Sequence, residues 1–539
     1  MTRSNRLLVL LPALALPMLA APALDAQSAQ SSQTAEAEVF LQALQALSRM
    51  HQNAPTDSLL WEAALDGMIE SLEDPYAAVF TPVESEQWEE DTTGNYSGIG
   101  LQITQLNDEV TVTAVFRSTP ASDIGVQVGD VIVGVNEHDA SDWTTDMAAD
   151  SIRGPVGSWV SVRFKRQGYD EPIVYDIKRD NVHVPAVNYG VLEGNIGYAV
   201  LDRVARNAAR EMDQALRELQ STRGLIIDLR RNPGGFLDES LMLADLFLTP
   251  GSTLASTSQR LPGGPLGTGA PDTDTESYED RWPARVPDLP VVILVDRFTA
   301  SGAEILAGAL QDYDRAVVLG ERTFGKGVVQ TVMPLRHGRR LRFTTGEWQT
   351  PLGRSLHRPR DMEMRPLTED LDTFPRIQTA LGRSLIDGGG IFPDLAVADD
   401  TLRTEEQELI RTANEVQFPL GLRLAEFALE QARVRREAGT TPGVDDAAFE
   451  GFLDAMIDEG LPAELVEDPV VRDYLHWRSR INVALRMDQV GREADFRMER
   501  DPVLEEAVRL LNTHSTQADL FRAVDSETEA RGASGTPPR

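Results

Sequence analysis

The chain has 539 residues, too many for a single hydrophobic core, so we expect several domains. Hydrophobic residues at 41% and charged residues at 25% are typical of globular protein, while a formal charge of -34 argues against nucleic acid as a partner. The sequence has no cysteine, which excludes disulfides, thiol catalysis and thiolate metal sites.

The N-terminus has the pattern of a secretory signal peptide. Two arginines precede an apolar stretch at residues 7–19, and small residues follow as far as Ala26. Prolines interrupt the stretch, and it is shorter than the roughly 20 residues of a membrane span. We predict a signal peptide at residues 1–26, cleaved after Ala23 or Ala26. No later segment is apolar enough to cross a bilayer, so we expect an exported protein, in the periplasm or outside the cell, with no integral membrane segment after cleavage.

The next two regions differ in periodicity. Residues 27–95 show apolar residues at helical spacing, which predicts a small helical region. Residues 96–180 contain short β-rich runs between Gly and Asp turns, with one helical stretch at residues 144–152. The β-rich runs lie at residues 100–103, 110–115, 131–135, 160–166 and 173–178.

The remaining chain divides into a mixed region and a helical region. Residues 185–397 alternate strand and helix patterns, which favours a layered α/β domain. Within them, residues 251–285 are rich in Gly, Pro, Thr and Asp and predict a mobile loop. Residues 401–525 have helical spacing and predict a C-terminal helical domain, and residues 526–539 lack apolar content and predict a disordered tail.

Ser301 follows a buried-strand pattern at residues 291–296 and precedes a helical run. It therefore lies at a strand-to-helix turn. Serine is common there as a helix N-cap, because its hydroxyl accepts a bond from an unpaired amide. The position is also where a nucleophile would be presented, and only its context separates the two interpretations.

Lys326 and Gln330 form the second candidate pair. With Val328 they occupy alternate positions, so they project from one face if the segment is extended. A lysine acts as a general base only when burial or nearby cations lower its ammonium pKa, and the apolar, glycine-flanked setting permits this. The alternative is a surface lysine on a loop.

The third candidate is a glycine turn whose backbone amides could bind an oxyanion. A buried strand at residues 225–229 ends in a turn that contains Gly234 and Gly235. With the amide of Gly302 these residues could form an oxyanion hole, although an ordinary tight turn has the same sequence. The sequence does not decide between Gly234 and Gly235 as the donor.

Five motifs now define a resemblance. They are DLRRNPGG, TASGAE, GERTFGKGVVQ, TPLGRS and GIFPD, in this order from Asp228 to Asp394. Together they resemble the C-terminal processing peptidases, also called tail-specific proteases. The resemblance implies that Ser301 is the nucleophile, Lys326 the general base and Gln330 the residue that orients the lysine. Gly302 stands where the family usually has alanine, and Trp348 where tyrosine is common.

Residues 96–180 resemble the PDZ domain that such peptidases carry, through Ser97 to Leu101, the turn at residues 128–132 and the turn at residues 152–157. In a PDZ domain the first of these segments holds a peptide carboxylate, which assigns Gly98, Ile99, Gly100 and Leu101 to peptide binding, and an extended peptide could add as a strand. The alternative is a module that only completes the fold.

The sequence therefore predicts a multidomain α/β protein with a layered serine-protease core, a preceding β-rich PDZ domain, and helical N- and C-terminal regions. We expect a Ser-Lys endopeptidase that recognises exported proteins by accessible C-terminal tails. A homo-oligomer or an adaptor protein stays open as a partner. No HExxH pair or acidic cluster has metal-site spacing, so we expect no metal and no cofactor. The alternatives are a catalytically silent PDZ scaffold and, more remotely, an acyl-CoA-type enzyme.

Overall fold

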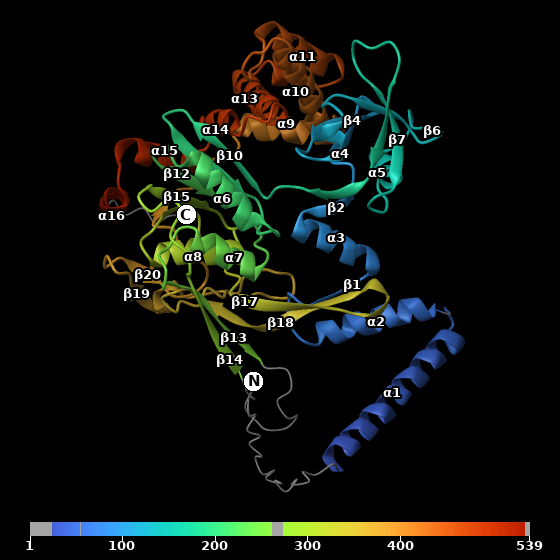
Figure 1. Cartoon of the computed structure of the whole chain (residues 1–539), viewed down its shortest axis with the longest axis vertical. Coiled ribbons are helices and arrows are strands. Elements are labelled where there is room, and N and C mark those ends of the chain that lie inside the picture. Colours follow the sequence, from blue (N-terminus) through green and yellow to red (C-terminus); the bar gives the residue numbers. More distant parts are fainter. Residues whose placement is uncertain (1–23, 54, 261–272, 534–539) are drawn as a thin grey trace, which may run out of the picture. The chain divides into compact units, whose positions relative to one another are not determined.

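The computed structural model describes residues 24–53, 55–260 and 273–533. The chain forms two compact units, residues 1–79 and residues 80–539 (Figure 1). Most of the predicted signal peptide, as far as residue 23, lies outside the described residues. The first unit contains two helices, as the spacing predicted, with the rings of Phe40 and Trp61 5.4 Å apart. These helices are α1 (Leu24–Met50) and α2 (Asp57–Glu70).

The second unit begins with helix α3 (Pro82–Thr93) and continues into an antiparallel sheet in the order β3-β4-β5-β7-β8. Strand β3 is at the edge of this sheet, and helix α5 (Thr145–Ile152) packs against it. Strands β2 (Asn95–Gly98) and β9 (Asp180–His183) pair where the chain enters and leaves this β-rich domain. The other elements are β3 (Leu101–Leu106), β4 (Glu109–Val115), α4 (Pro120–Asp123), β5 (Val131–Val135), β6 (His138–Asp139), β7 (Trp159–Lys165) and β8 (Ile173–Lys178).

A second sheet forms the centre of the layered core, in the order β10-β11-β12-β15-β16-β21. Strand β10 runs antiparallel to β11, and the other neighbours are parallel. Every residue of β12 and β15 is buried, so apolar side chains on both faces of the sheet need cover. The strands are β10 (Val187–Leu192), β11 (Ile196–Leu201), β12 (Leu225–Asp228), β15 (Val291–Val295), β16 (Val317–Gly320) and β21 (Leu395–Ala396).

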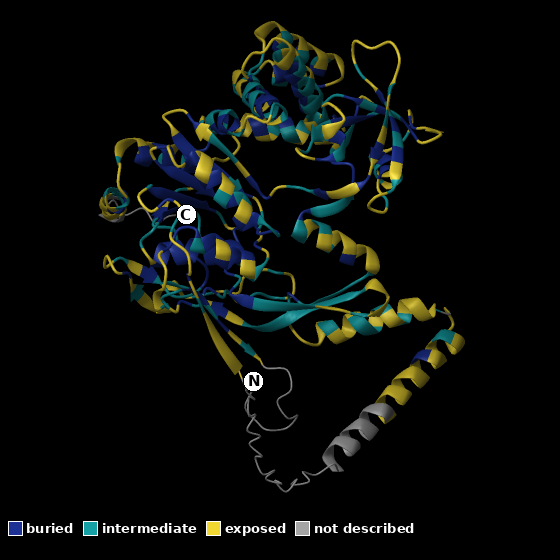
Figure 2. Cartoon of the chain, in the orientation of Figure 1, coloured by how far each residue is buried: buried dark blue, intermediate teal, exposed yellow. Residues whose placement is uncertain are grey.

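Two groups of helices cover this sheet. Helices α6 (Ala208–Leu219), α7 (Leu237–Asp245) and α8 (Gly302–Asp312) pack on the face that contains Ile227 and Ile293. The opposite face, which contains Ile226 and Val292, packs against the last three helices of the chain, as the buried layers of Figure 2 illustrate. Those helices are α14 (Val490–Met498), α15 (Pro502–Thr513) and α16 (Gln517–Ala533).

This packing corrects two boundaries that we drew from the sequence. Residues 490–525 were assigned to a separate helical domain, yet they share a hydrophobic core with the central sheet. Helix α16 extends to Ala533, so residues 526–533, expected to be disordered, are helical. Helical periodicity predicted the helices but contains no information about which surface each helix covers.

A third sheet lies beside the core and contains strands β17 (Val328–Pro334), β18 (Arg340–Gln349), β13 (Thr253–Arg260) and β14 (Thr273–Glu279). Strands β13 and β14 pair antiparallel within the segment that we expected to be a mobile loop. Their Thr and Ser content suits strands, whereas the Gly and Pro that suggested a loop belong largely to residues 261–272, outside the described residues. The short β1 (Ala78–Phe80), β19 (Arg376–Gln378) and β20 (Ser384–Ile386) complete the strands.

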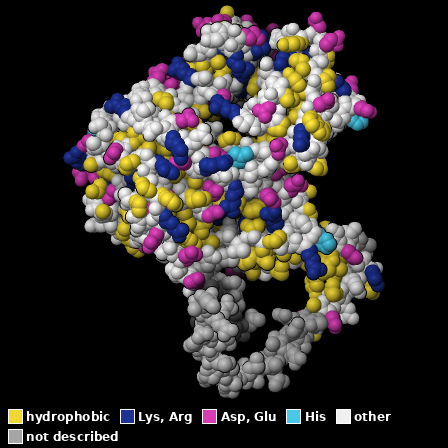
Figure 3. All heavy atoms as spheres, in the orientation of Figure 1, with side chains coloured by type: hydrophobic (Ala, Val, Ile, Leu, Met, Phe, Trp, Pro, Cys, Tyr) yellow, Lys and Arg dark blue, Asp and Glu magenta, His cyan; other side chains and the backbone are white. Residues whose placement is uncertain are grey.

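The remaining helices, α9 to α13, form a helical module with a small core of its own. Among the helices of the described residues, none combines the length and the apolarity that a membrane span requires. On the face in Figure 3, Lys and Arg side chains are interspersed with Asp and Glu. The module contains α9 (Thr404–Glu415), α10 (Leu420–Glu437), α11 (Asp446–Asp458), α12 (Ala463–Val466) and α13 (Pro469–Arg486).

Candidate active site

Ser301 occupies a strained turn between β15 and α8. Its backbone has φ 52° and ψ -116°, in the left-handed half of the map that a serine avoids without compensation. Helix α8 begins at the next residue and is buried along its whole length, whereas Ser301 itself is partly exposed. A strained serine at the tip of a strand-to-helix turn is the geometry of a nucleophile elbow, which presents the hydroxyl to a substrate.

The carboxylate of Glu304 connects this turn to the segment that carries the lysine. Its Oε2 accepts hydrogen bonds from the backbone amides of Ser301 and Lys326, both at 2.8 Å. Its Oε1 accepts from the amide of Gly325 at 2.8 Å and from the hydroxyl of Thr323 at 2.5 Å. The side chain is fully buried, and burial raises the pKa of Glu304 despite these four bonds. One buried carboxylate therefore fixes both backbones.

Lys326 is held at its backbone and at its side chain. The indole N–H of Trp348 donates to the carbonyl of Lys326 at 3.0 Å, and Nζ of Lys326 donates to Oε1 of Gln330 at 2.7 Å. The predicted approach of Lys326 and Gln330 is therefore present. Trp348 is almost fully buried, so the tryptophan that departs from the family pattern has a structural task here. Lys326 is one of only three lysines in the sequence.

The structure distinguishes between the two glycines of the predicted oxyanion turn. The amide of Gly234 already donates to Oδ1 of Asn232 at 2.8 Å. Within the described ranges, no group of the protein accepts a hydrogen bond from the amide of Gly235 or from that of Gly302, the first residue of α8. These two amides are the available donors, and the positive end of the helix dipole adds to the second.

Close backbone contact explains why glycine occupies this junction. Gly234 has φ 90°, and a Cβ there would lie 2.6 Å from the carbonyl oxygen of Ala300 and 2.7 Å from the amide of Gly302. At Gly302 a Cβ would lie 2.4 Å from the hydroxyl oxygen of Ser240, a buried residue of α7. The glycine that departs from the family pattern is therefore matched to a serine on the neighbouring helix.

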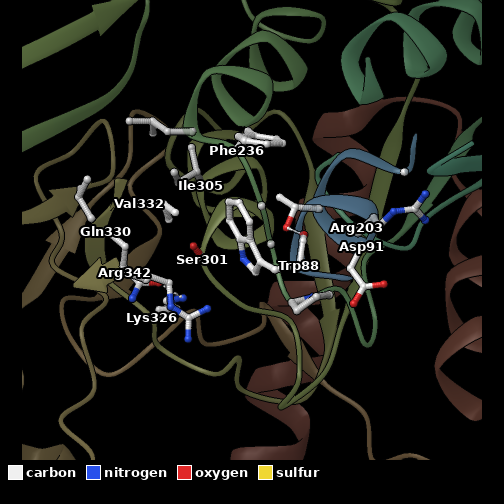
Figure 4. A pocket seen from close by; sticks show the side chains of 18 of the residues that line it. Trp88, Asp91, Arg203, Phe236, Ser301, Ile305, Lys326, Gln330, Val332 and Arg342 are labelled. Carbon is white, nitrogen blue, oxygen red and sulfur yellow. Dashed lines mark hydrogen bonds between the residues drawn. The ribbon is translucent and has the colours of Figure 1, made fainter. Parts of the chain in front are cut away.

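Ser301, Lys326 and the two glycine turns line one cavity of about 1040 Å³. Ser301, Lys326 and Gln330 lie toward one side of it, and Trp88, Asp91 and Arg203 toward the other (Figure 4). Apolar side chains, among them Phe236, Ile305 and Val332, contribute to the walls. Sequence reasoning missed the α3 residues Trp88 and Asp91, because nothing local to that helix indicates which surface it faces.

Asn232 is a further residue whose role the sequence did not reveal. It is fully buried, and its side-chain amide donates to the carbonyl of Leu201 at 2.8 Å. Its own carbonyl accepts from the amide of Ala300 at 2.9 Å. Together with the bond to Gly234, these contacts fasten the oxyanion turn to the nucleophile turn. The Asn-Pro pair in DLRRNPGG signalled a turn but not these partners.

The predicted carboxylate loop of the β-rich domain leads into the edge strand β3. Ile99 is buried, Gly100 has φ 93°, and Leu101 is the first residue of β3. The ring of Tyr96 lies against Gly98, where a Cβ would approach it to 2.8 Å, and burial raises the pKa of Tyr96 to about 12. Strand β3 lies at the edge of its sheet and contacts α5 and α10, so the loop leads into an edge strand, the kind of strand to which a peptide can add.

Neither metal nor histidine chemistry is indicated at the cavity. In the described part of the chain, no group of three or more His, Asp or Glu side chains is arranged to hold a metal ion. His357 lies behind Gly327, and burial lowers the pKa of its imidazole.

Comparison with known protein families places both predicted modules. Residues 195–364 match peptidase family S41, and residues 87–165 match the PDZ domain. Ser301, Lys326, Gln330 and the glycine turns fall in the first range, and the loop at residues 98–101 falls in the second.

Two curated relatives show comparable similarity. The "Probable CtpA-like serine protease" of Staphylococcus epidermidis is 31% identical over 341 residues, covering 62% of this chain and 67% of its own. The "Carboxy-terminal-processing protease" of Bartonella bacilliformis is 33% identical over 308 residues, covering 56% of this chain and 68% of its own. Among solved structures, the photosystem II D1 C-terminal processing protease is 25% identical and covers 67% of this chain and 92% of its own, with a TM-score of 0.34.

Proposed function

Since this chain belongs to peptidase family S41, the carboxy-terminal-processing serine proteases, we propose that it is an endopeptidase with Ser301 as nucleophile and Lys326 as general base. One observation carries the proposal. A serine in a strained strand-to-helix turn shares a cavity with a lysine amine bonded to Gln330 and with two available amides, those of Gly235 and Gly302.

The first chemical step forms an acyl-enzyme. The neutral amine of Lys326 takes the proton of Ser301 Oγ as this oxygen bonds to the substrate carbonyl carbon, and the π electrons move to the carbonyl oxygen. The N–H groups of Gly235 and Gly302 stabilise that oxyanion. Loss of one such donor costs about 3 to 4 kcal/mol of transition-state stabilisation. The ammonium of Lys326 then protonates the leaving amine as the C–N bond breaks, and water activated by Lys326 releases the acyl group.

Gln330 suits the lysine because it is neutral. A carboxylate at the same place would favour the charged ammonium and oppose proton acceptance. The amide oxygen at 2.7 Å instead orients Nζ without supplying a full opposing charge. Glu304 is close by in sequence, but its oxygens are occupied by backbone amides and by the hydroxyl of Thr323, so it holds the turns in place.

Substrates are exported proteins whose C-terminal tails bind along β3, with the terminal carboxylate at the loop of residues 98–101. The match to the PDZ domain and the open edge of β3 support this part of the proposal. The apolar walls of the cavity, including Phe236 and Ile305, favour apolar side chains next to the cut bond. The signal-peptide pattern at residues 1–26 supports export.

The test is cleavage of an unstructured reporter with an apolar C-terminal tail, followed over time by mass spectrometry. We expect cleavage by the wild type and a loss of at least about 10³-fold in Ser301→Ala and in Lys326→Ala. Lys178→Ala, at an exposed lysine of β8, is the matched control and keeps full activity. Cleavage by Ser301→Ala at the wild-type rate would refute the mechanism, and an inactive wild type that binds the tail would indicate a scaffold.

A further inference from the structure

A buried ion triad connects the central sheet to the turn between α14 and α15. The guanidinium of Arg230 bonds to Asp228 at the end of β12, with Nε to Oδ1 at 3.0 Å and Nη2 to Oδ2 at 2.7 Å. Its other edge bonds to Asp501, with Nη1 to Oδ1 at 3.0 Å and Nη2 to Oδ2 at 2.8 Å. Arg230 thus makes a two-point contact with each carboxylate, the geometry that fixes an arginine most firmly.

The triad is shielded from water. The side chains of Asp228, Arg230 and Asp501 are 4%, 13% and 6% exposed. Burial alone would lower the pKa of the Arg230 guanidinium, but the charges and hydrogen bonds of Asp228 and Asp501 together raise it. The hydroxyl of Tyr198 donates to Asp228 at 2.7 Å and completes the set. Arg230 therefore stays charged and is held between the two carboxylates.

Arg230 stands two residues before the oxyanion turn. The next residue, Arg231, has φ 62°, and its amide donates to Oδ1 of Asp296 at 3.0 Å. Asn232 follows and holds the Gly234 amide, and the neighbouring Gly235 lines the Ser301 cavity. A shift of Arg230 is transmitted to that donor through a short, sharply bent segment. A donor displaced by about 1 Å loses much of its effect on an oxyanion.

We propose that Asp501 is a positioning residue for the reaction: by gripping Arg230 from the α14–α15 turn, it holds the oxyanion turn of residues 232–235 in register with Ser301. The inference rests on the proposed function and extends it beyond residues 195–364, the range that matches the peptidase family. It gives the C-terminal helices a direct part in the active site, in addition to covering the sheet.

A second role of Asp501 has to be separated from the first. Asp501 is also the N-cap of α15, where its Oδ1 accepts from the amide of Leu504 at 2.9 Å. Asn is as good an N-cap as Asp, so Asp501→Asn keeps the cap and removes the charge that grips Arg230. Asp468 caps α13 in the same way and makes no ion pair with any residue that the structure describes, which makes Asp468→Asn the matched control.

The cavity beside the triad permits a chemical rescue. Arg230 and Asp501 line a second cavity, of about 600 Å³, and Ser301 is not part of its lining. Formate can enter such a space and supply the carboxylate that Asp501→Gly lacks. We expect 50 mM formate to restore much of the activity of Asp501→Gly, and to leave the wild type and Asp468→Gly unchanged.

The experiment measures kcat and KM on the tail reporter, melting temperature, and hydrogen exchange of the amides of residues 232–235. We expect Asp501→Asn to lower kcat about tenfold with KM within twofold, and to speed exchange of the turn, while Asp468→Asn changes neither. A kcat within twofold of wild type with unchanged exchange overturns the inference, as does an Asp501→Gly variant that formate does not rescue.

The two proposals fail separately. If the wild type does not cleave the reporter, the proposed peptidase function is refuted. Amide hydrogen exchange of residues 232–235 then still tests whether Asp501 holds the turn. Faster exchange in Asp501→Asn alone upholds the contact, and equal exchange in both variants rejects it.

Discussion

Two buried carboxylates, Glu304 and Asp228, organise neighbouring regions by opposite means. Glu304 lies between the catalytic turns and accepts only from neutral donors, three backbone amides and one hydroxyl. Asp228 lies at the contact with the C-terminal helices and faces the guanidinium of Arg230. Burial raises the pKa of Glu304, whereas the pKa of Asp228 is lowered, because Arg230 outweighs the burial that would raise it.

The different partners of Glu304 and Asp228 suit the different parts of the structure that they hold. Hydrogen bonds from backbone amides are directional, so Glu304 fixes the positions of the Ser301 and Lys326 backbones without adding a cation near the reacting groups. At the helix contact, two carboxylates each make a two-point contact with the guanidinium of Arg230, so paired charges hold this side chain in place.

The largest expected effect tests this contrast directly. In Glu304→Gln, an NH₂ group replaces one oxygen that accepts two N–H donors, so the turns of Ser301 and Lys326 must separate. We expect kcat to fall about 10²- to 10³-fold, the loss typical of one misplaced catalytic donor. In Asp228→Asn, Arg230 keeps the side-chain oxygen of the asparagine as an acceptor and keeps its bonds to Asp501. We expect kcat of this variant to fall about tenfold. Equal losses in the two variants, measured on the tail reporter, would contradict the comparison.

The second prediction concerns packing between the catalytic turns. Gly302→Ala places a methyl group 2.4 Å from Ser240 Oγ and should destabilise the protein by about 1–3 kcal/mol and lower kcat about tenfold. Adding Ser240→Ala removes the clashing oxygen and should restore the stability. Activity should recover only in part, because the methyl still lies 3.3 Å from the Gly235 amide nitrogen. A double-mutant cycle, measured by urea unfolding and by kcat, gives the coupling between the two substitutions in stability and in activity. Additive losses would show that the methyl group does not clash with Ser240.

A matched pair of tryptophans gives the third prediction. Trp348 donates to the carbonyl of Lys326, and Trp477 of α13 donates to the carbonyl of Phe496 at 2.8 Å. Replacement of either by Phe removes one N–H and should cost about 1 kcal/mol of stability. Only Trp348→Phe should also lower kcat, by about threefold to tenfold, because, of the two tryptophans, only Trp348 is bonded to the lysine. Similar kcat values for the two variants would assign Trp348 a purely structural part.

The smallest effect extends the comparison to a third carboxylate. Asp280 is buried beside Asp245, and burial followed by that neighbour raises the pKa of Asp280 to about 6. Between pH 4 and 6 the folded state holds a proton that the unfolded state has released, so stability falls as the pH rises through this window. Asp280→Asn does not ionise and should be about 1 kcal/mol more stable than wild type at pH 7.5, with no difference at pH 4.

Thermal unfolding at the two pH values measures that difference, and activity should not change, because Asp280 lies outside the catalytic cavity. An equal effect of the substitution at both pH values would mean that Asp280 ionises normally.

Much of this protein follows from its sequence. Apolar runs such as residues 225–227 and 291–295 predicted the buried strands, because parallel strands are covered on both faces. The spacing of Lys326 and Gln330 predicted their approach, although only Gln330 lies in a strand, β17. The motifs placed Ser301 at a strand-to-helix turn. Local conformation and local spacing determine these features, and a sequence displays both.

Tertiary structure alone decided the rest. Gly235 rather than Gly234 is the available donor because the side chain of Asn232 occupies the Gly234 amide. Helices α14 to α16 complete the core sheet, and Asp501 reaches Arg230 from a distant part of the chain. Hydrophobic periodicity predicts which residues are buried. It does not predict which residues they contact, because these contacts form only when separate helices and strands pack together. The availability of the Gly235 amide and the contact of Asp501 with Arg230 both depend on this packing.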